Sequence, residues 1–506
     1  MARRLAELVR REIVLRRDEA RIAGEVEYGF RHALVREAAY GMLTERDRRV
    51  GHALAGEWLD RAGGADAIAL AEHFEIGGAP ARAAEAYLRA AEEALRGGDL
   101  AAALARAERG IGCEVAGDVA GRLRRVQAEA HMWRGELSLA VERGTEATDR
   151  LERGSAAWFS AVMHVLVASS KLGRLDEVER WTSVAADAVP AADALGVKLR
   201  CLANGATTLT VVGRYAEGRA LIEAVERAFM DTEVRDMGAV APLHEARAVY
   251  AICTGDLVVG ADGMDAVSRA FEQAGDRRNA STARAGLGSV YAELGDFERA
   301  ESMLRAALQE ADRMHLHEVK HGAEANLAQV LVVRGRPAEA RALGEAAASA
   351  SRQAGFVRTE LFARCYLARA CVAMGDLDAA EREARAAVAL SPNAPTLGVQ
   401  AFALLARALL GLGRIDEAVR TATEANSMLE SFGTLEEGES LVRLTFAEAL
   451  AAGGRQGEAA AAIASARAAL LARADKLSDP GWRERFLRDV PDNARTLDLA
   501  RQWLDG

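Results

Sequence analysis

A helical hairpin is encoded in the stretch Leu287-Gly288-Ser289-Val290-Tyr291-Ala292-Glu293-Leu294-Gly295-Asp296-Phe297-Glu298-Arg299-Ala300. Glycine accepts the left-handed backbone that ends a helix, and Gly295 stands where a first helix would stop. Asp296 is a good N-cap for the helix that follows. Small residues seven before and five after this glycine, Gly288 and Ala300, let the two helices cross closely. The stretch therefore predicts two antiparallel helices joined by a tight turn.

The same turn recurs along most of the chain. Its glycine is followed by a charged residue in every copy, and successive glycines are 37 to 42 residues apart. The recurring glycines are Gly98, Gly135, Gly173, Gly213, Gly255, Gly295, Gly335, Gly375, Gly413 and Gly454. A steady period of this length is the sequence signature of a solenoid built from stacked helical units. A coiled coil is disfavoured, because these glycines interrupt any long helix.

The composition agrees with a helical scaffold. The 506 residues are 50% hydrophobic and only 5% aromatic, and alanine is abundant. Alanine has the best helix propensity, whereas β-sandwiches and barrels favour β-branched and aromatic residues. No apolar stretch approaches the ~18–20 residues of a membrane span, and no signal peptide follows Met1. We therefore expect an all-α protein of the cytoplasm.

The repeat resembles the tetratricopeptide repeat. Residues 287–300 carry that family's leucine-glycine, tyrosine, glycine-aspartate-aromatic and alanine positions in order. The period near 40 exceeds the family's usual ~34 residues. The resemblance covers residues 66–470 and implies a right-handed α-solenoid of about ten helical hairpins. Residues 31–65 are then expected to be linking helices, and residues 471–506 to be capping helices that cover the last repeat.

The resemblance also implies where a partner would bind. A tetratricopeptide superhelix presents a concave groove lined by the first helix of each pair. The groove-facing candidates are Thr282, Ser289, Glu293, Asn326 and Gln329. An extended peptide, a partner helix or a small effector would fit such a groove, and no cofactor is expected. The alternative for each of these residues is an ordinary solvated helix face.

The N-terminal region differs from the repeats. Residues 2–11 are predicted to form a short basic helix, and Ile13 and Leu15 alternate with polar residues, as do Val26, Tyr28 and Phe30. This alternation around a turn at Ala23-Gly24 predicts a β-hairpin. A helix followed by a hairpin is the last part of a winged-helix domain. Residues 1–30 are therefore interpreted as a partial winged helix whose first helices lie outside this sequence.

A second resemblance joins this region to the repeats. The stretch Phe30-Arg31-His32-Ala33-Leu34-Val35-Arg36-Glu37-Ala38-Ala39-Tyr40 is similar to a segment of bacterial signalling ATPases of the STAND type. In that family it follows an ATPase module with its winged helix and leads into tetratricopeptide-like repeats, often in chains that also carry a kinase or cyclase module. The resemblance implies that this chain is the sensor arm of such an ATPase, or a free-standing relative of that arm.

Catalytic motifs of that kind are missing from these 506 residues. A P-loop needs glycine-lysine followed by serine or threonine, but the four lysines follow Ser170, Val197, Val319 and Asp475. None of the nine histidines precedes arginine, so no kinase catalytic loop is present. We therefore expect no enzyme activity, and any ATPase or kinase module would lie upstream.

One string resembles a metal site. His317-Glu318-Val319-Lys320-His321 has the HExxH spacing of zinc proteases, with two imidazoles one helical turn apart. Its context is the start of a repeat helix, and Lys320 places a charge where a buried zinc helix would not. We expect a solvated helix start, with an adventitious metal site or a metallopeptidase as the alternatives.

A further alternative is nucleic-acid binding through the basic N-terminus. The arginines that could approach phosphate are Arg3, Arg4, Arg10, Arg11, Arg16 and Arg17. Nine acidic residues are interleaved within residues 1–50, and the net charge of the whole chain is −10. Both features disfavour nucleic acid as a partner. The preferred function is therefore a protein-interaction scaffold that binds its partner in the concave groove.

Overall fold

The structure is a computed structural model that describes residues 2–18, 20, 24–63, 66–231 and 237–505. Its contacts divide the chain into two compact units. Unit 1 is Met1–Ala130 with Glu146–Glu152, and unit 2 is His131–Thr145 with Arg153–Gly506. None of the described helices is long and apolar enough to cross a membrane. The four segments predicted from the sequence, 1–30, 31–65, 66–470 and 471–506, remain a prediction.

Unit 1 starts with a helix and a two-stranded hairpin, as the sequence predicts. β1 (Val14–Arg16) pairs antiparallel with β2 (Tyr28–Phe30), and Val14 lies opposite Phe30. The predicted turn at Ala23-Gly24 lies partly outside the described residues. The helices are α1 (Ala2–Arg10), α2 (Ala33–Gly41), α3 (Glu45–Ala62), α4 (Ala67–Ile76), α5 (Pro80–Arg96), α6 (Leu100–Gly112) and α7 (Gly117–Arg134), of which the last four residues belong to unit 2.

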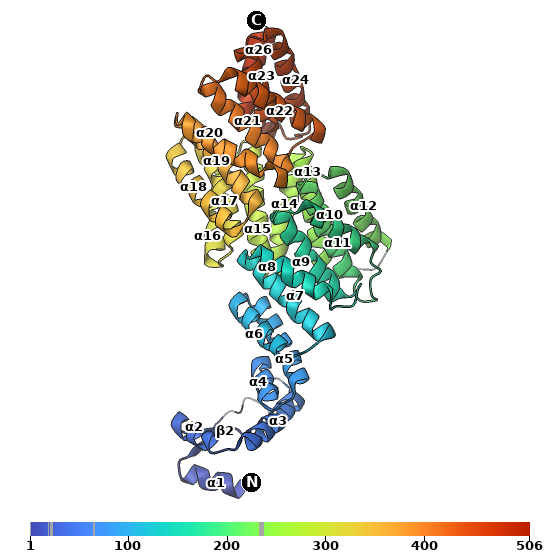
Figure 1. Ribbon diagram of the computed structural model, residues 1–506, viewed down its shortest axis with the longest axis vertical. Helices are drawn as coiled ribbons and strands as arrows, with labels where there is room; N and C mark the ends of the chain where they lie inside the picture. Colours follow the sequence, from blue (N-terminus) through green and yellow to red (C-terminus); the bar gives the residue numbers. More distant parts are fainter. Residues whose placement is uncertain (1, 19, 21–23, 64–65, 232–236, 506) are drawn as a thin grey trace. The chain divides into compact units, whose positions relative to one another are not determined.

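Unit 2 continues the same hairpins and ends in two further helices (Figure 1). Consecutive helices pack as pairs, and each pair packs on the next. The helices are α8 (Leu137–Thr148, completed in unit 1), α9 (Ala156–Lys171), α10 (Leu175–Asp187), α11 (Leu195–Val211), α12 (Tyr215–Asp231), α13 (Met237–Cys253), α14 (Leu257–Gln273), α15 (Arg277–Glu293), α16 (Phe297–Arg313), α17 (His317–Val333), α18 (Pro337–Ala354), α19 (Val357–Ala373), α20 (Leu377–Leu390), the short 3-10 helix η1 (Ser391–Asn393), α21 (Pro395–Gly411), α22 (Ile415–Phe432), α23 (Glu439–Ala452), α24 (Gln456–Ala474), α25 (Pro480–Arg488) and α26 (Pro491–Leu504).

The turns have the geometry that the sequence predicts. Gly295 has a φ of +86°, in the left-handed region that favours glycine. The Asp296 carboxylate accepts a hydrogen bond from the backbone N–H of Arg299 at 3.1 Å and so caps α16. Nine other turn glycines also have positive φ. The predicted all-α solenoid of tetratricopeptide-like hairpins, with a small helix and hairpin at the N-terminus, is confirmed.

Small residues let the two helices of a pair cross closely. A Cβ atom added at Gly288 would lie 2.7 Å from Cγ of Leu304, closer than carbon atoms pack. Ala300 and Leu287 are fully buried beside this crossing, in the same core cluster. The hairpin α15–α16 is therefore held by a close crossing that an added methyl group would push apart.

In unit 2, hairpins that are far apart in the sequence are in contact. The Tyr215 hydroxyl donates a hydrogen bond at 3.3 Å to the carbonyl of Thr434, 219 residues later. One repeat further along, the Lys476 ammonium donates at 2.8 Å to the carbonyl of Thr254, 222 residues earlier. This spacing equals about five and a half periods of 40 residues. One turn of the superhelix therefore takes five to six repeats, and its successive turns are in contact.

The last two helices pack onto the inside of this superhelix. Trp482 stacks on Tyr291 with ring centroids 5.8 Å apart, and the Arg485 guanidinium pairs with Asp296 at 2.6 Å. Leu499 on α26 is buried in a core cluster shared with α23 and α24. The C-terminal helices thus cover the end of the array and also reach back to α15 and α16.

Candidate functional site

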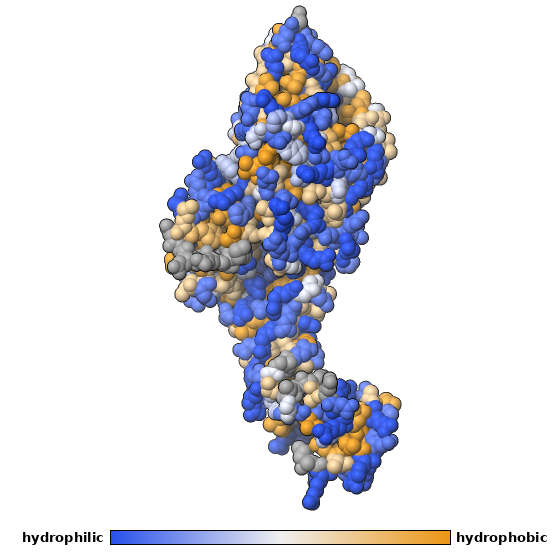
Figure 2. All heavy atoms as spheres, turned by 180° about the vertical axis from the view of Figure 1, so that it is seen from behind, coloured by the Kyte–Doolittle hydropathy of each residue, from blue (hydrophilic) through white to orange (hydrophobic). Residues whose placement is uncertain are grey.

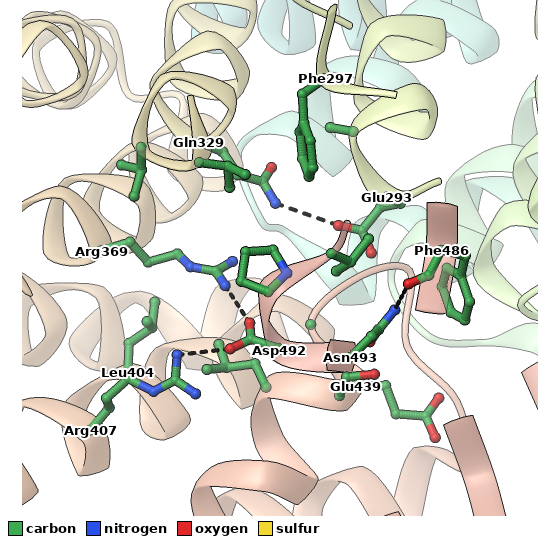
Figure 3. Close-up of a pocket in the computed structure, with 18 of the residues that line it drawn as sticks. Glu293, Phe297, Gln329, Arg369, Leu404, Arg407, Glu439, Phe486, Asp492 and Asn493 are labelled. Atoms are coloured by element: carbon green, nitrogen blue, oxygen red, sulfur yellow. Dashed lines mark hydrogen bonds and ion pairs between the residues drawn. The ribbon is translucent and has the colours of Figure 1, made fainter. Parts of the chain in front are cut away.

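A cavity of about 360 Å³ lies inside unit 2 (Figure 3). The helices α15, α17, α19, α21 and α23, each the first of a hairpin, supply most of its wall. Val490, which precedes α26, and Pro491, the first residue of α26, also line the cavity. This volume lies within the ~300–1,000 Å³ typical of small-molecule sites in proteins. Apolar side chains line most of it, and a few charged groups converge among them.

Two arginines from neighbouring repeats meet one aspartate at one end of the cavity. Asp492, at the start of α26, is buried, with 8% of its surface exposed. Its carboxylate pairs with Arg369 of α19 and with Arg407 of α21, the second at 2.9 Å. Burial alone would raise the pKa of Asp492, but Arg407 and Arg369 hold it below its ordinary value. Asp492 is therefore ionised, and the two guanidinium groups exceed it by one positive charge.

A second set of three charges lies on another side of the cavity. Glu439, at the start of α23, is buried and accepts from Arg443 and from Arg473, both at 3.0 Å. Both carboxylate oxygens are used, since Arg443 binds Oε1 and Arg473 binds Oε2. This set also carries two guanidinium groups for one carboxylate.

Glu293, the last residue of α15, faces the cavity with almost no hydrogen bonding. Its carboxylate accepts one long hydrogen bond, at 3.4 Å, from the side-chain amide of Gln329. Burial raises the pKa of Glu293, while Arg473 and Arg369 oppose the rise from a distance. Among the ion pairs found in the described residues, none includes Glu293. This carboxylate therefore keeps unused acceptor capacity toward the cavity.

A buried tyrosine–glutamate pair lies behind Glu293. The Tyr366 hydroxyl lies 2.6 and 2.8 Å from the two carboxyl oxygens of Glu437, and both residues are buried. Burial raises the pKa of Glu437 to about 8, and the charge of Glu293 adds to the rise. Glu437 is therefore mostly protonated at neutral pH, which limits the repulsion between the two acidic groups.

The structure brings together four of the five residues predicted for the groove. Glu293 and Gln329 line the cavity, and Gln329 donates to Glu293. One turn away, the Asn326 amide donates to the Ser289 hydroxyl at 2.6 Å. Thr282 is exposed and bonds to a backbone carbonyl of its own helix at 3.1 Å. A binding role for these residues remains a prediction.

The residues that sequence reasoning missed follow a register that the sequence contains. Arg369 and Arg407 each stand six residues before a turn glycine, as Ser289 and Gln329 do. The positions of Arg369 and Arg407 in their repeats therefore match those of Ser289 and Gln329, and the repeat period alone predicts that they face the same groove. Asp492 had no such signal, because its contact with Arg369 spans 123 residues and depends on how the superhelix closes.

The HExxH string is engaged in local contacts. The Glu318 carboxylate pairs with the Lys171 ammonium, and His321 Nδ1 lies 2.9 Å from the Glu324 carboxylate. Burial and neighbouring basic groups lower the pKa of His317. Across the described ranges, no group of three or more histidine, cysteine, aspartate or glutamate side chains is arranged to hold a metal ion.

Part of the N-terminal arginine set is paired with acidic residues. Arg10 and Arg11 share Glu7, the second at 2.8 Å, and Arg17 pairs with Glu27 at 3.3 Å. These arginines are well exposed, so the pairs contribute little energy and leave the charges accessible. Nucleic-acid binding remains the alternative prediction for this region.

A second hollow, of about 460 Å³, lies among α10, α11 and α12. Its arginine, Arg214, donates to Glu179 at 2.8 Å and lies 3.8 Å from Glu217. Two carboxylates therefore face one guanidinium in this hollow, so its excess charge is negative, whereas the Asp492 set in the first cavity has a positive excess.

Comparison with known protein families gives a match that includes the repeat at residues 287–300. The family model described as "Tetratricopeptide repeat" matches residues 281–312, which cover most of α15 and α16. No curated protein sequence matches the chain.

Several solved structures are similar to the chain at low sequence identity. A Rap protein complexed with competence and sporulation factor is 13% identical, with a TM-score of 0.47, over 68% of this chain and 99% of that one. The Cut9–Hcn1 hetero-tetramer of the APC/C gives 13% identity and a TM-score of 0.44, over 93% and 95% of the two chains. A STAND protein with a tetratricopeptide repeat sensor, from Pyrococcus horikoshii, gives 15% and 0.37, and covers 84% of this chain. The chain spans 58% of that protein's length.

Proposed function

We propose that this chain is a non-catalytic scaffold or sensor arm that binds a protein or peptide partner, or a small effector, on the concave side of unit 2. The observation that carries the proposal is the cavity, where Glu293, Arg369 and Arg407 from three repeats face apolar walls. Burying charges costs desolvation energy, so a buried ion pair is weak evidence for stability. Charged groups with unused hydrogen-bonding capacity favour a binding role instead.

A photo-crosslinking experiment tests this proposal. Phe297 lines the cavity, and replacing it with p-benzoylphenylalanine keeps an aromatic ring in place. The matched control carries the same residue at Val259, which is exposed on α14. After irradiation in the native host, the Phe297 position is expected to yield a discrete adduct that mass spectrometry identifies as one partner. The Val259 position is expected to yield none.

Two results would overturn the scaffold proposal. One is the absence of any adduct from Phe297, together with no binding of a small effector, while the variant remains folded by circular dichroism. The other is the same set of adducts from Phe297 and Val259, which would indicate random collision rather than a site in the cavity.

The finer proposal is that the chain serves a bacterial regulatory ATPase. The similarity of Phe30–Tyr40 to a segment of STAND-type ATPases supports it. An antibody raised against unit 2 would detect a much larger polypeptide in the native host if an ATPase module is fused to this chain. A band of 506 residues, with no ATPase among its crosslinked partners, would contradict the assignment to an ATPase.

A further inference from the structure

The cavity of unit 2 has charged groups of opposite sign on different walls. Glu293 projects from the end of α15, while Arg369 and Arg407 project from α19 and α21 toward Asp492 (Figure 3). Between these groups the lining is aliphatic or aromatic and includes Val332, Val372, Leu404 and Phe297.

The arginine end retains positive charge and free donors. Each guanidinium carries five N–H donors, and the contacts described for Arg369 and for Arg407 use one N–H each, both on Asp492. One carboxylate neutralises only one of the two charges. The second guanidinium charge has no counter-ion among these contacts, so this end of the cavity favours an added anion.

The glutamate end has a carboxyl group with unused acceptor capacity. The hydrogen bond from Gln329 is long, at 3.4 Å, and comes from a neutral amide. A carboxylate in an apolar wall is costly unless a cation or several donors face it. Arg369 and Arg473 stabilise Glu293 only from a distance, and Glu437 behind it is acidic. An added ammonium group is therefore favoured at this end.

We propose that this cavity binds a zwitterion with an aliphatic body, its ammonium group on Glu293 and its carboxylate on Arg369 and Arg407. A free aliphatic amino acid and a short aliphatic peptide share this chemistry. A single ligand of this kind compensates both ends at once and buries its apolar part against Val332, Val372 and Leu404. This inference rests on the proposed function, since it assigns the chemistry of the effector that the concave side would sense.

Isothermal titration calorimetry on the full chain tests the proposal with four probes. Leucine and the dipeptide Leu-Leu both carry an ammonium group and a carboxylate, but the two charges are farther apart in the dipeptide. Comparing their affinities therefore distinguishes a free amino acid from a short peptide as the ligand. N-acetyl-leucine lacks the ammonium group, and leucinamide lacks the carboxylate. We expect at least one zwitterion to bind, and both single-charge analogues to bind at least tenfold more weakly. No binding of either zwitterion at millimolar concentration, or equal binding of an analogue, would overturn the proposal.

Two variants test the assigned contacts. Glu293→Gln is expected to weaken zwitterion binding at least tenfold, because a neutral amide cannot compensate an ammonium group. Arg407→Met is expected to do the same, because it leaves Arg369 alone with Asp492. The matched control is Glu298→Gln, on the exposed first turn of α16. Unchanged affinity in Glu293→Gln would overturn the ammonium contact.

The two proposals fail separately. An adduct from p-benzoylphenylalanine at Phe297, together with no zwitterion binding, would overturn only the inference about the ligand. Zwitterion binding without any adduct would overturn only the protein partner.

Discussion

Proteins usually bury apolar side chains and expose charged ones. The interior of unit 2 and the surface of residues 15–76 both depart from this distribution, each in a different way. In unit 2, ionisable groups such as Asp492, Glu439 and Glu437 are buried. In residues 15–76 of unit 1, apolar groups are exposed. Of the 18 large apolar side chains exposed in the described part of the chain, 13 lie between Leu15 and Ile76. Figure 2 shows apolar side chains gathered at this N-terminal end.

The helices of the two regions differ in what they bury. α2 buries no residue, and α3 buries only Gly56. α21, by contrast, buries twelve residues between its neighbours. The repeats therefore supply the stability of this chain, whereas the apolar side chains of α2 and α3 contribute little to it. Large exposed apolar patches are uncommon on monomers, and buried charges are costly, so both regions depart from what folding alone requires.

The strongest destabilisation is expected from Asp492→Ala. The substitution leaves the partly buried Arg369 and Arg407 without their counter-ion, which costs up to about 3–5 kcal/mol. Urea unfolding followed by circular dichroism measures the loss. The control Asp498→Ala removes an ion pair with Arg501 whose side chains are mostly exposed, and should cost under about 1 kcal/mol. Equal losses in the two variants would mean that the interior charges are as dispensable as surface ones.

A smaller effect is expected from pH. The pKa of Glu437 is about 8 in the folded chain and about 4.3 when unfolded, so the folded state holds one more proton between these values. Its stabilising contribution is therefore complete below about pH 4.3 and is lost as pH rises toward 8. The free energy of unfolding should fall by a few kcal/mol between pH 5 and pH 8.

The variant Glu437→Gln is expected to flatten this slope. Glu424→Gln, on the exposed surface of α22, retains Glu437 and its charged neighbours and should keep the slope. Parallel slopes in wild type and Glu437→Gln would show that another group carries the pH dependence.

The closure of the superhelix is tested by a matched pair of glycines. Gly173 and Gly335 have φ of +71° and +75°, so alanine at either is strained by about 1–2 kcal/mol. A Cβ atom at Gly173 would also lie 2.7 Å from the carbonyl oxygen of Asn393 on the next turn, whereas nothing lies within 4 Å at Gly335. Gly173→Ala should therefore lose about 1–3 kcal/mol more than Gly335→Ala. Equal losses would contradict the contact between turns.

The smallest effect is expected on the exposed surface of unit 1. Leu34 and Leu54 are 78% and 61% exposed, so replacing either with serine should change the free energy of unfolding by under about 0.5 kcal/mol. Leu441→Ser, in the core beside the cavity, should cost over about 3 kcal/mol. A large loss at Leu34 or Leu54 would mean that this surface packs on something within the chain.

Local sequence features predicted most of the fold. The left-handed turn at Gly295, the cap at Asp296 and the close crossing at Gly288 depend on neighbours within a few residues, and a single repeat displays them. The same repeat also predicted that Glu293 faces the groove, and the repeat period extended this prediction to Gln329 in the next repeat. Both line the cavity.

The other residues of the cavity could not be predicted from short stretches of sequence. Asp492 reaches Arg369 and Arg407 because the C-terminal helices pack inside a superhelix whose turns touch. The number of repeats per turn follows from small rotations that add up over many hairpins. No residue type at a fixed spacing encodes that sum, so sequence reasoning assigned residues 471–506 only to a cap.

The interior charges are most directly tested by removing them together. In the triple variant Arg369→Met, Asp492→Leu, Arg407→Met, apolar side chains of similar length replace the buried ion pairs. Replacing such a cluster with well-packed apolar residues is often neutral or stabilising. If these charges serve binding, the triple variant should unfold within about 1 kcal/mol of wild type in urea, while zwitterion binding is lost. A loss as large as that of Asp492→Ala, with binding retained, would contradict a binding role for the interior of unit 2.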